Sequence, residues 1–337
     1  MQATGNMASI EPSNGLSKEP AEPANEPANE PAKPRKRSRF LKTIIRYKWL
    51  YLLLVPGVLY YIVYHYIPMF GLLIAFKDYN LMKGVWDSPW AGFDNFRTIF
   101  ASPDFPVLIK NTVLLSFYRI AFNMLPDVML ALMLNEIRAR WFKRVVQTIT
   151  YGPHFLSWII VYGLVFSFFA PGAGLFTTLF RDLGWGDLDV LTNSAAFRPM
   201  LLLTEVWKST GFGAIIYLAA LASINHELYE AAVVDGAGRW RQLWHITLPG
   251  IREVFILLLI LRIGNIMDAG FEQVYIFLNA RVYDVGDILD TWIFRRGIEQ
   301  MEFSVPAAMG VFKSIIGLIL VIGANRLAKK VGGSGIW

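Results

Sequence analysis

The sequence contains no cysteine and has few of the groups that carry enzyme chemistry. The absence of Cys from 337 residues excludes disulfide bonds, a thiolate nucleophile, an iron–sulfur cluster and Cys-ligated zinc. The four histidines are scattered and show no His-Glu-x-x-His spacing, so no metal site is predicted. A Gly-x4-Gly-Lys-Ser/Thr loop is also missing, so the chain cannot hydrolyse ATP by itself.

Charge is scarce as well, and what there is lies in short stretches between long apolar runs. Charged residues make up 17% of the chain, against 55% hydrophobic and 15% aromatic residues, and the mean hydropathy is +0.41. This composition excludes a secreted enzyme or a nucleic-acid binder and predicts a membrane protein. Eight of the 32 Lys and Arg lie in residues 33–48, just before the first apolar run, so the net charge of +6 indicates membrane topology.

The first 40 residues differ from the rest of the chain. Residues 22–32 repeat Glu-Pro-Ala-Asn, a Pro-rich acidic pattern with too little apolar surface to fold. We therefore predict a disordered cytoplasmic tail over residues 1–40, a membrane domain over 41–330 and a short cytoplasmic tail over 331–337. No apolar segment precedes the basic cluster at 35–37, so the first apolar run is expected to be a retained anchor and not a signal peptide.

Apolar windows of roughly 20 residues or more predict an all-α, polytopic protein with six transmembrane helices. Alternate loops hold 18 and 8 Lys and Arg, so the positive-inside rule places both termini in the cytoplasm. An amphipathic patch at 175–183, in the loop between the third and fourth windows, predicts a surface helix. The windows cover approximately residues 50–76, 108–134, 145–169, 199–223, 252–277 and 304–325.

The loop 224–249, between the fourth and fifth windows, is predicted to be cytoplasmic. Its Ala-rich stretch, with Glu230 in the first turn, predicts a short helix, and Gly236 and Gly238 suit a C-terminal cap or a tight turn that accommodates no side chain. A second short helix is expected over 239–247. Small Ala side chains on an exposed helix can fit a groove of another protein, but a capped surface helix joining two spans explains the same residues.

The loop reads Glu230-Ala231-Ala232, three residues, Gly236, nine residues and then Ile-x-Leu-Pro at 246–249. This pattern resembles the signature loop of permease subunits in type I ABC importers. Stretches at 142–151, 216–221 and 270–273 resemble the polysaccharide-type branch of carbohydrate permeases, which includes lipoprotein-named and alginate-uptake permeases. The likeness covers roughly residues 40–337. The loop positions that match the signature are Glu230, Ala231, Ala232, Gly236, Ile246, Leu248 and Pro249.

The resemblance implies a six-helix type I permease subunit of the bacterial inner membrane, with no enzymatic activity and no cofactor of its own. It implies a second, similar permease subunit, two cytoplasmic ATPases that bind ATP and Mg, and a periplasmic or lipid-anchored solute-binding protein. Nothing in the sequence excludes a homodimer of permeases. The implied cargo is an oligosaccharide, with alginate or another uronic-acid oligosaccharide as the leading candidate. The residues implied to contact the ATPase are Glu230, Ala231, Ala232, Asp235, Gly236 and Gly238.

Polar side chains inside apolar windows are costly in lipid, so they should face the bundle interior or a water-filled path. Arg119, Asn123 and Asp127 recur every four residues and therefore share one face of the second window. That stripe also fits another class of protein, an ion-coupled secondary transporter or a membrane enzyme in which it relays protons. Such a carrier would not require the signature loop. An ABC permease for a peptide or a lipid is a third reading.

Aromatic rings beside carboxylates, amides and a Lys suit sugar recognition, because a sugar ring offers apolar faces and hydroxyl groups. In the fifth window Asn265, Asp268 and Glu272 are expected to share one helical face. The same groups can instead pair across helices, and Glu205 and Lys208 are close enough in sequence to neutralise each other. The outer loops hold more Asp and Glu than Lys and Arg, which gives no support to a polyanionic cargo. One basic side chain in the path is nevertheless enough to bind a uronate. The candidate substrate-path residues are Asn265, Asp268, Glu272, Gln273, Trp207 and Lys208.

Overall fold

A computed structural model describes residues 46–330 of the protein. Within that range the chain forms helices and loops and no strand, apart from one isolated bridge between Lys77 and Trp90, so the predicted all-α class is confirmed there. The predicted tails over 1–40 and 331–337 lie outside the described residues. The described part divides into two compact units, one ending at Val63 and the other beginning at Tyr64.

Helices of several lengths account for most of the described chain. The N-terminal unit contains α2 and the first residues of η1, and all later elements belong to the second unit. In chain order the elements are α2 (Lys48–Tyr61), η1 (Ile62–Tyr66), η2 (Ile67–Phe76), α3 (Gly84–Asp87), α4 (Asp94–Ala101), α5 (Phe105–Glu136), α6 (Arg140–Tyr151), η3 (Gly152–Phe155), α7 (Trp158–Phe169), α8 (Leu175–Asp182), α9 (Ser194–Ala222), α10 (His226–Val234), α11 (Arg239–Gln242), η4 (Leu243–Thr247), α12 (Leu248–Gly264), α13 (Phe271–Phe277), η5 (Ala280–Val282), α14 (Tyr283–Gly286), α15 (Leu289–Phe294), η6 (Arg295–Glu299) and α16 (Ser304–Lys330).

Length and composition identify the described helices that can cross a membrane. Three helical stretches qualify, Lys48–Phe76, Phe105–Glu136 and Ser304–Lys330, and each matches a predicted window. Two bent pairs, α6 with α7 and α9 with α10, qualify only when each pair is taken together, which gives up to five spans in the described residues. The remaining window, 252–277, divides into α12 with 17 residues and α13 with seven.

The third predicted window is bent by 101° between η3 and α7. Pro153, in η3, has no N–H to continue the hydrogen-bond ladder of α6, and the chain changes direction after Phe155, where Leu156 and Ser157 are extended. Ser157 then starts α7 by accepting a hydrogen bond from the backbone N–H of Ile160 (3.4 Å). The surface helix expected at 175–183 is confirmed as α8.

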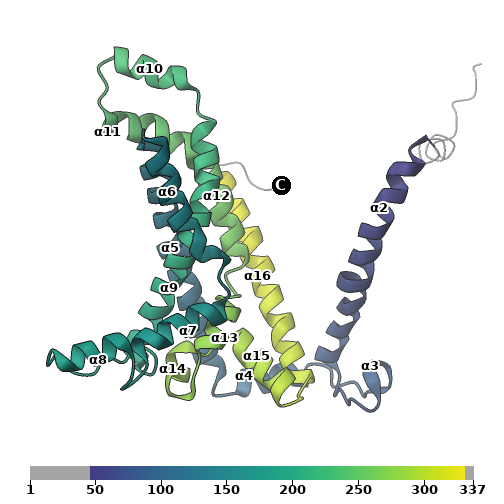
Figure 1. The fold of residues 1–337 in the computed structure, drawn as a ribbon. Helices are drawn as coiled ribbons and strands as arrows, with labels where there is room; N and C mark the ends of the chain where they lie inside the picture. Colours follow the sequence, from purple (N-terminus) through teal and green to yellow (C-terminus); the bar gives the residue numbers. More distant parts are fainter. Residues whose placement is uncertain (1–45, 331–337) are drawn as a thin grey trace, which may run out of the picture. The chain divides into compact units, whose positions relative to one another are not determined.

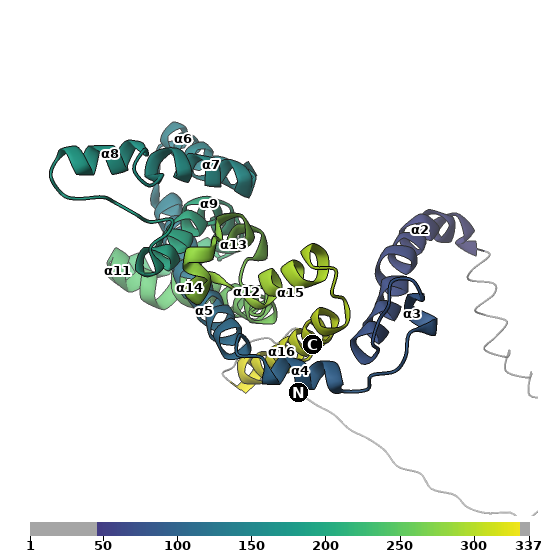
Figure 2. The same ribbon diagram turned by 90° about the horizontal axis from the view of Figure 1, so that it is seen from below.

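The long helices of the second unit pack into one bundle. Helix α5 contacts α9, and α12 contacts α5, α9 and α16. Helix α10 lies at one end of this bundle, while α13, α14 and α15 lie at the other end (Figure 1). Viewed from that second end, these short helices lie across the bundle between α9 and α16 (Figure 2).

Helix α9 approaches α6 closely at Gly211. A Cβ atom placed on Gly211 would lie 1.9 Å from the carbonyl oxygen of Thr150, which belongs to rigid helical backbone. Next to this contact, the rings of Phe212 and His154 stack with centroids 4.0 Å apart. A side chain at position 211 would therefore separate the two helices.

We expect Gly211→Ala to lower the free energy of unfolding by about 1–3 kcal/mol, the usual cost of overpacking. The matched control is Gly163→Ala in α7, where an added Cβ meets nothing within 4 Å and should be neutral or slightly stabilising. Thermal unfolding of the purified protein in detergent measures both variants. Equal melting temperatures for the two variants would contradict this packing role of Gly211.

Candidate functional site

Helix α10 and its two ends correspond to the predicted cytoplasmic loop. Asn225 is the N-cap, and its Oδ1 accepts a hydrogen bond from the backbone N–H of Glu227 at 3.0 Å. The helix therefore starts four residues before Glu230, which lies in its middle and not in its first turn as expected. The second predicted helix is confirmed as α11 and η4, which continue directly into α12.

Gly236 ends α10 in the left-handed conformation, with φ of +74°. The N–H groups of Gly236 and Ala237 donate to the carbonyl oxygens of Val233 (3.0 Å) and Ala232 (2.8 Å), which is the Schellman cap. We expected that no side chain fits at Gly236 and Gly238. This is wrong for the available space, because an added Cβ meets no atom within 4 Å at either position. Gly236 is required by its backbone angle, whereas Gly238 has an ordinary φ of −68°.

The surface of α10 is open. None of its residues is buried, and the side chains of Glu230 and Ala231 are exposed. The apolar side chains of Val233 and Val234 are 63% and 87% exposed. One hydrogen bond, between the Tyr229 and Thr247 hydroxyls at 2.9 Å, ties α10 to η4. The helix is thus fixed at its ends while its apolar surface is free to contact another protein.

The fifth predicted window is interrupted at residues 265–270, where α12 stops and α13 has not yet begun. Ala269 and Gly270 in this turn have φ of 44° and 76°. Two side chains of α5 satisfy the freed carbonyls: Arg119 Nη1 donates to the oxygen of Ala269 at 2.8 Å, and Ser116 Oγ donates to that of Ile266. The expected single helical face is therefore wrong for Asn265, Asp268 and Glu272, because the helix breaks between them.

The polar stripe on α5 faces protein, as predicted. Arg119 forms an ion pair with Glu205 of α9, and Asn123 donates to the same carboxylate at 3.4 Å. Asp127 pairs with Arg262 of α12 at 2.6 Å. Glu205 is therefore neutralised by Arg119 and not by Lys208, which corrects the expectation drawn from their spacing.

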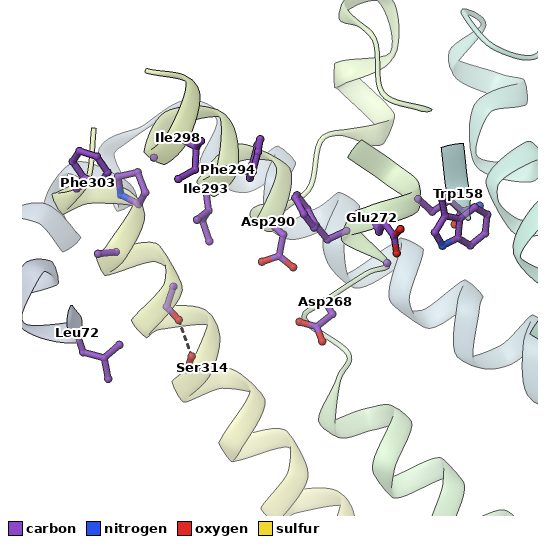
Figure 3. Close-up of a pocket in the computed structure, with 17 residues that line it drawn as sticks. Leu72, Trp158, Asp268, Glu272, Asp290, Ile293, Phe294, Ile298, Phe303 and Ser314 are labelled. Atoms are coloured by element: carbon purple, nitrogen blue, oxygen red, sulfur yellow. Dashed lines mark hydrogen bonds between the residues drawn. The ribbon is translucent and has the colours of Figure 1, made fainter. Parts of the chain in front are cut away.

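A cavity of about 920 Å³ lies beside the turn 265–270, and we call it the large cavity (Figure 3). Its lining combines three carboxylates with aromatic rings and apolar side chains. In Figure 3 the carboxylates of Asp268 and Asp290 lie near each other, and Glu272 and Trp158 line the same cavity. The lining residues that can contact a sugar are Trp158, Asp268, Phe271, Glu272, Asp290, Phe294 and Phe303.

A smaller cavity of about 370 Å³ shares Asp268 and Gly270 with the large cavity. Arg119, Glu205 and Asn265 line it. Gly270 is necessary here, because a Cβ at this position would lie 1.1 Å from Nη1 of Arg119. The strained turn and the Arg119 side chain therefore shape the region where the two cavities meet.

The remaining candidate path residues have other surroundings. Gln273 lines the large cavity but is buried, and its Nε2 donates to Leu201 O and Thr204 Oγ1, both at 2.8 Å, which joins α13 to α9. Lys208 donates to the carbonyl oxygen of His154 at 2.8 Å. Trp207 is 48% exposed and lines neither cavity.

Sequence reasoning missed two charged residues of this site. Lys313 of α16 binds Asp268 at 2.5 Å and Asp290 at 2.7 Å, and so connects three separate elements. A lone Lys inside the sixth apolar window is a signal that could have identified it. Asp290 follows no such pattern in the sequence. Within residues 46–330 no group of three or more His, Asp or Glu could hold a metal ion.

Comparison with known proteins agrees with the family that the loop 224–249 resembles and with the observed fold. Residues 128–332 match the family described as "Binding-protein-dependent transport system inner membrane component". Protein LplB of Bacillus subtilis (strain 168) is 47% identical over 302 residues, which cover 90% of this chain and 95% of LplB. YteP of the same strain, a polygalacturonan/rhamnogalacturonan transport system permease protein, is 45% identical over 305 residues, with the same coverage of both chains.

Two solved structures have the same fold. One is a chain of a bacterial ABC transporter involved in the import of the acidic polysaccharide alginate, with a TM-score of 0.81, 38% identity and coverage of 87% of this chain and 99% of that chain. The other is a chain of a bacterial alginate ABC transporter in complex with an alginate pentasaccharide-bound periplasmic protein. Its TM-score is 0.82 and its identity 37%, and the match covers 88% of this chain and 100% of that chain. Because these relatives are transport components, this chain is a transporter subunit and not an enzyme. It belongs to the family of binding-protein-dependent transport system inner membrane components, the permease subunits of ABC importers.

Proposed function

We propose that this chain carries an oligosaccharide across the bacterial inner membrane as the permease subunit of an ATP-driven importer. The observation that carries the proposal is α10, a nine-residue helix with both ends capped and no residue buried. A helix held in this way can transmit a push from a protein that binds it. The residues proposed to meet the ATPase remain Glu230, Ala231, Ala232, Asp235, Gly236 and Gly238.

The connection from α10 to the cavities supports mechanical coupling. The elements α11, η4 and α12 follow one another without a break from Arg239 to Gly264, a helical stretch of roughly 40 Å at 1.5 Å per residue. This stretch ends at the turn 265–270, which contributes to both cavities. Closure of the ATPases around ATP and Mg would thus move the turn and rock the permease between inward- and outward-facing states.

The proposed assembly contains a second permease subunit, two cytoplasmic ATPases and a periplasmic or lipid-anchored solute-binding protein. Both termini and α10 would face the cytoplasm, in agreement with the distribution of Lys and Arg among the loops. Likeness to a transporter solved with its periplasmic protein supports the last of these partners.

The oligosaccharide class rests on the mixture of rings and carboxylates in the large cavity, since rings stack on sugar faces and carboxylates accept hydroxyl hydrogen bonds. Three of the relatives are named for the transport of alginate or polygalacturonan. Alginate and other uronic-acid oligosaccharides are therefore the specific candidates that the relatives suggest.

The proposal is tested by measuring ATP hydrolysis of the complex, co-purified with its ATPase in lipid nanodiscs and supplied with its binding protein. We expect one class of oligosaccharide in a panel of neutral and acidic chains to stimulate hydrolysis. Uptake into proteoliposomes should stop on ATP depletion and continue in the presence of an uncoupler. Failure to co-purify an ATPase, or uptake that an uncoupler abolishes, would contradict the proposal.

A further inference from the structure

The charges around the large cavity do not balance. Asp268, Glu272 and Asp290 line it, and no Lys or Arg does (Figure 3). The ammonium group of Lys313 lies between Asp268 and Asp290 and neutralises one charge of the three. Glu272 is exposed and has no hydrogen-bond or ion-pair partner among the described residues. The cavity wall therefore keeps a surplus of two negative charges, three carboxylates against one ammonium group.

The basic groups around the cavities are already bound to carboxylates. This holds for both Arg residues that line the smaller cavity and for Lys313 beside the large one, so none of the three offers a free positive charge to an anionic ligand. The pairs are Arg119 with Glu205, Arg262 with Asp127 at 2.6 Å, and Lys313 with Asp268 at 2.5 Å and Asp290 at 2.7 Å.

Lys208 is one further cation near the large cavity. Its Nζ lies 5.2 Å from the centre of the Trp158 ring, and Trp158 lines the cavity. The same Nζ donates to the carbonyl oxygen of His154, and Lys208 does not itself line the cavity. Its charge is therefore turned towards the backbone between α6 and α7.

Taking this cavity as the cargo path, which rests on the proposed function, we propose that it selects an uncharged oligosaccharide over a uronate-rich one. Hydroxyl groups of a neutral sugar can donate to the Glu272 and Asp268 carboxylates while a ring face packs on Trp158 or Phe271. A uronate carboxylate cannot donate and would bring a like charge beside the unpaired carboxylate of Glu272. Because Glu272 is exposed, salt should screen this repulsion. The names of the relatives favour an acidic cargo, and the charges of this wall favour a neutral one.

A matched pair of ligands tests this charge argument. The probes are a tetrasaccharide of 1,4-linked hexuronate and the same tetrasaccharide after reduction of its carboxylates to primary alcohols. Each is titrated by saturation-transfer-difference NMR against the purified complex without its binding protein, so that the binding protein's own selectivity does not enter. At low salt we expect the reduced tetrasaccharide to bind about tenfold more tightly, with a smaller ratio at high salt.

Variants assign the effect to the cavity. Glu272→Gln removes the unpaired carboxylate and should lower the ratio. Glu253→Gln changes an exposed carboxylate on α12 that lines neither cavity, and should leave the ratio unchanged. Lys208→Gln should also leave it unchanged. Equal or tighter binding of the hexuronate, or a loss of hexuronate binding specific to Lys208→Gln, would overturn the proposal. Binding of neither probe would overturn it too, while co-purification of the ATPase and its stimulation would still decide the proposed function separately.

Discussion

Replacing Gly236 by valine is expected to abolish stimulation of ATP hydrolysis by the loaded binding protein, while leaving membrane insertion intact. Gly236 has φ of +74°, and a side chain in the left-handed region costs about 1–2 kcal/mol, more for a β-branched residue. That cost is a factor of about 5–30 in an equilibrium. The cap of α10 would then open, and the helix would lose the fixed position from which a push can be transmitted.

The matched control is Gly236→Asn at the same position, because asparagine tolerates the left-handed conformation far better than valine. An added Cβ at Gly236 meets nothing within 4 Å, so the two variants differ mainly in the cost of the φ of +74°. Expression, insertion and ATPase activity of the two variants are compared in the same nanodisc assay. If both variants coupled normally, or if Gly236→Asn were as defective as Gly236→Val, the left-handed cap would not be what positions α10.

The sequence was a good guide wherever local chemistry decides the structure. The helix at the predicted coupling loop, its end at Gly236 and the surface helix α8 all depend on propensity, glycine freedom and amphipathic spacing within a few residues. The stripe of Arg119, Asn123 and Asp127 was also predictable, because helical period and the cost of polar groups in lipid act on every such segment.

The interruption at 265–270 was not predictable in the same way. The mean hydropathy of a window averages over the break at 265–270. Gly264 and Gly270 do not reveal the break either, because glycine also occurs in continuous helices. What stabilises the break comes from α5, since Ser116 and Arg119 bind carbonyls 150 residues later in the chain. Spacing likewise suggested a pair between Glu205 and Lys208, but tertiary packing brought Arg119 to the carboxylate.

The two partners of the ion pair between Asp127 and Arg262 differ in how deeply they are buried. This difference allows a test of the role of the polar stripe on α5. The Asp127 side chain is 1% exposed, whereas that of Arg262 is 30% exposed and lines the smaller cavity. Asp127 also packs on α9 without spare room, because a Cβ on Gly213 would lie 2.4 Å from its Cγ. A lone carboxylate would thus be left without solvent, while a lone guanidinium could still reach the water of the cavity.

Arg262→Met is therefore expected to lower the free energy of unfolding by about 3–5 kcal/mol, the cost of an uncompensated buried charge. Asp127→Asn keeps the shape of the side chain and should cost less, about 1–3 kcal/mol. Denaturation of the purified complex should show the double variant to be more stable than Arg262→Met alone, since the buried charge is then gone.

The same variants separate a structural pair from a proton relay. If Asp127 and Arg262 only hold α5 against α12, Asp127→Asn should retain ATP-driven uptake in proportion to the amount of folded protein, at any proton gradient. A relay requires a carboxyl group that gains and loses a proton, which asparagine cannot do, so uptake would disappear although the protein remained folded. That second result would return the ion-coupled carrier to consideration, because the stripe would then act in transport and not in packing.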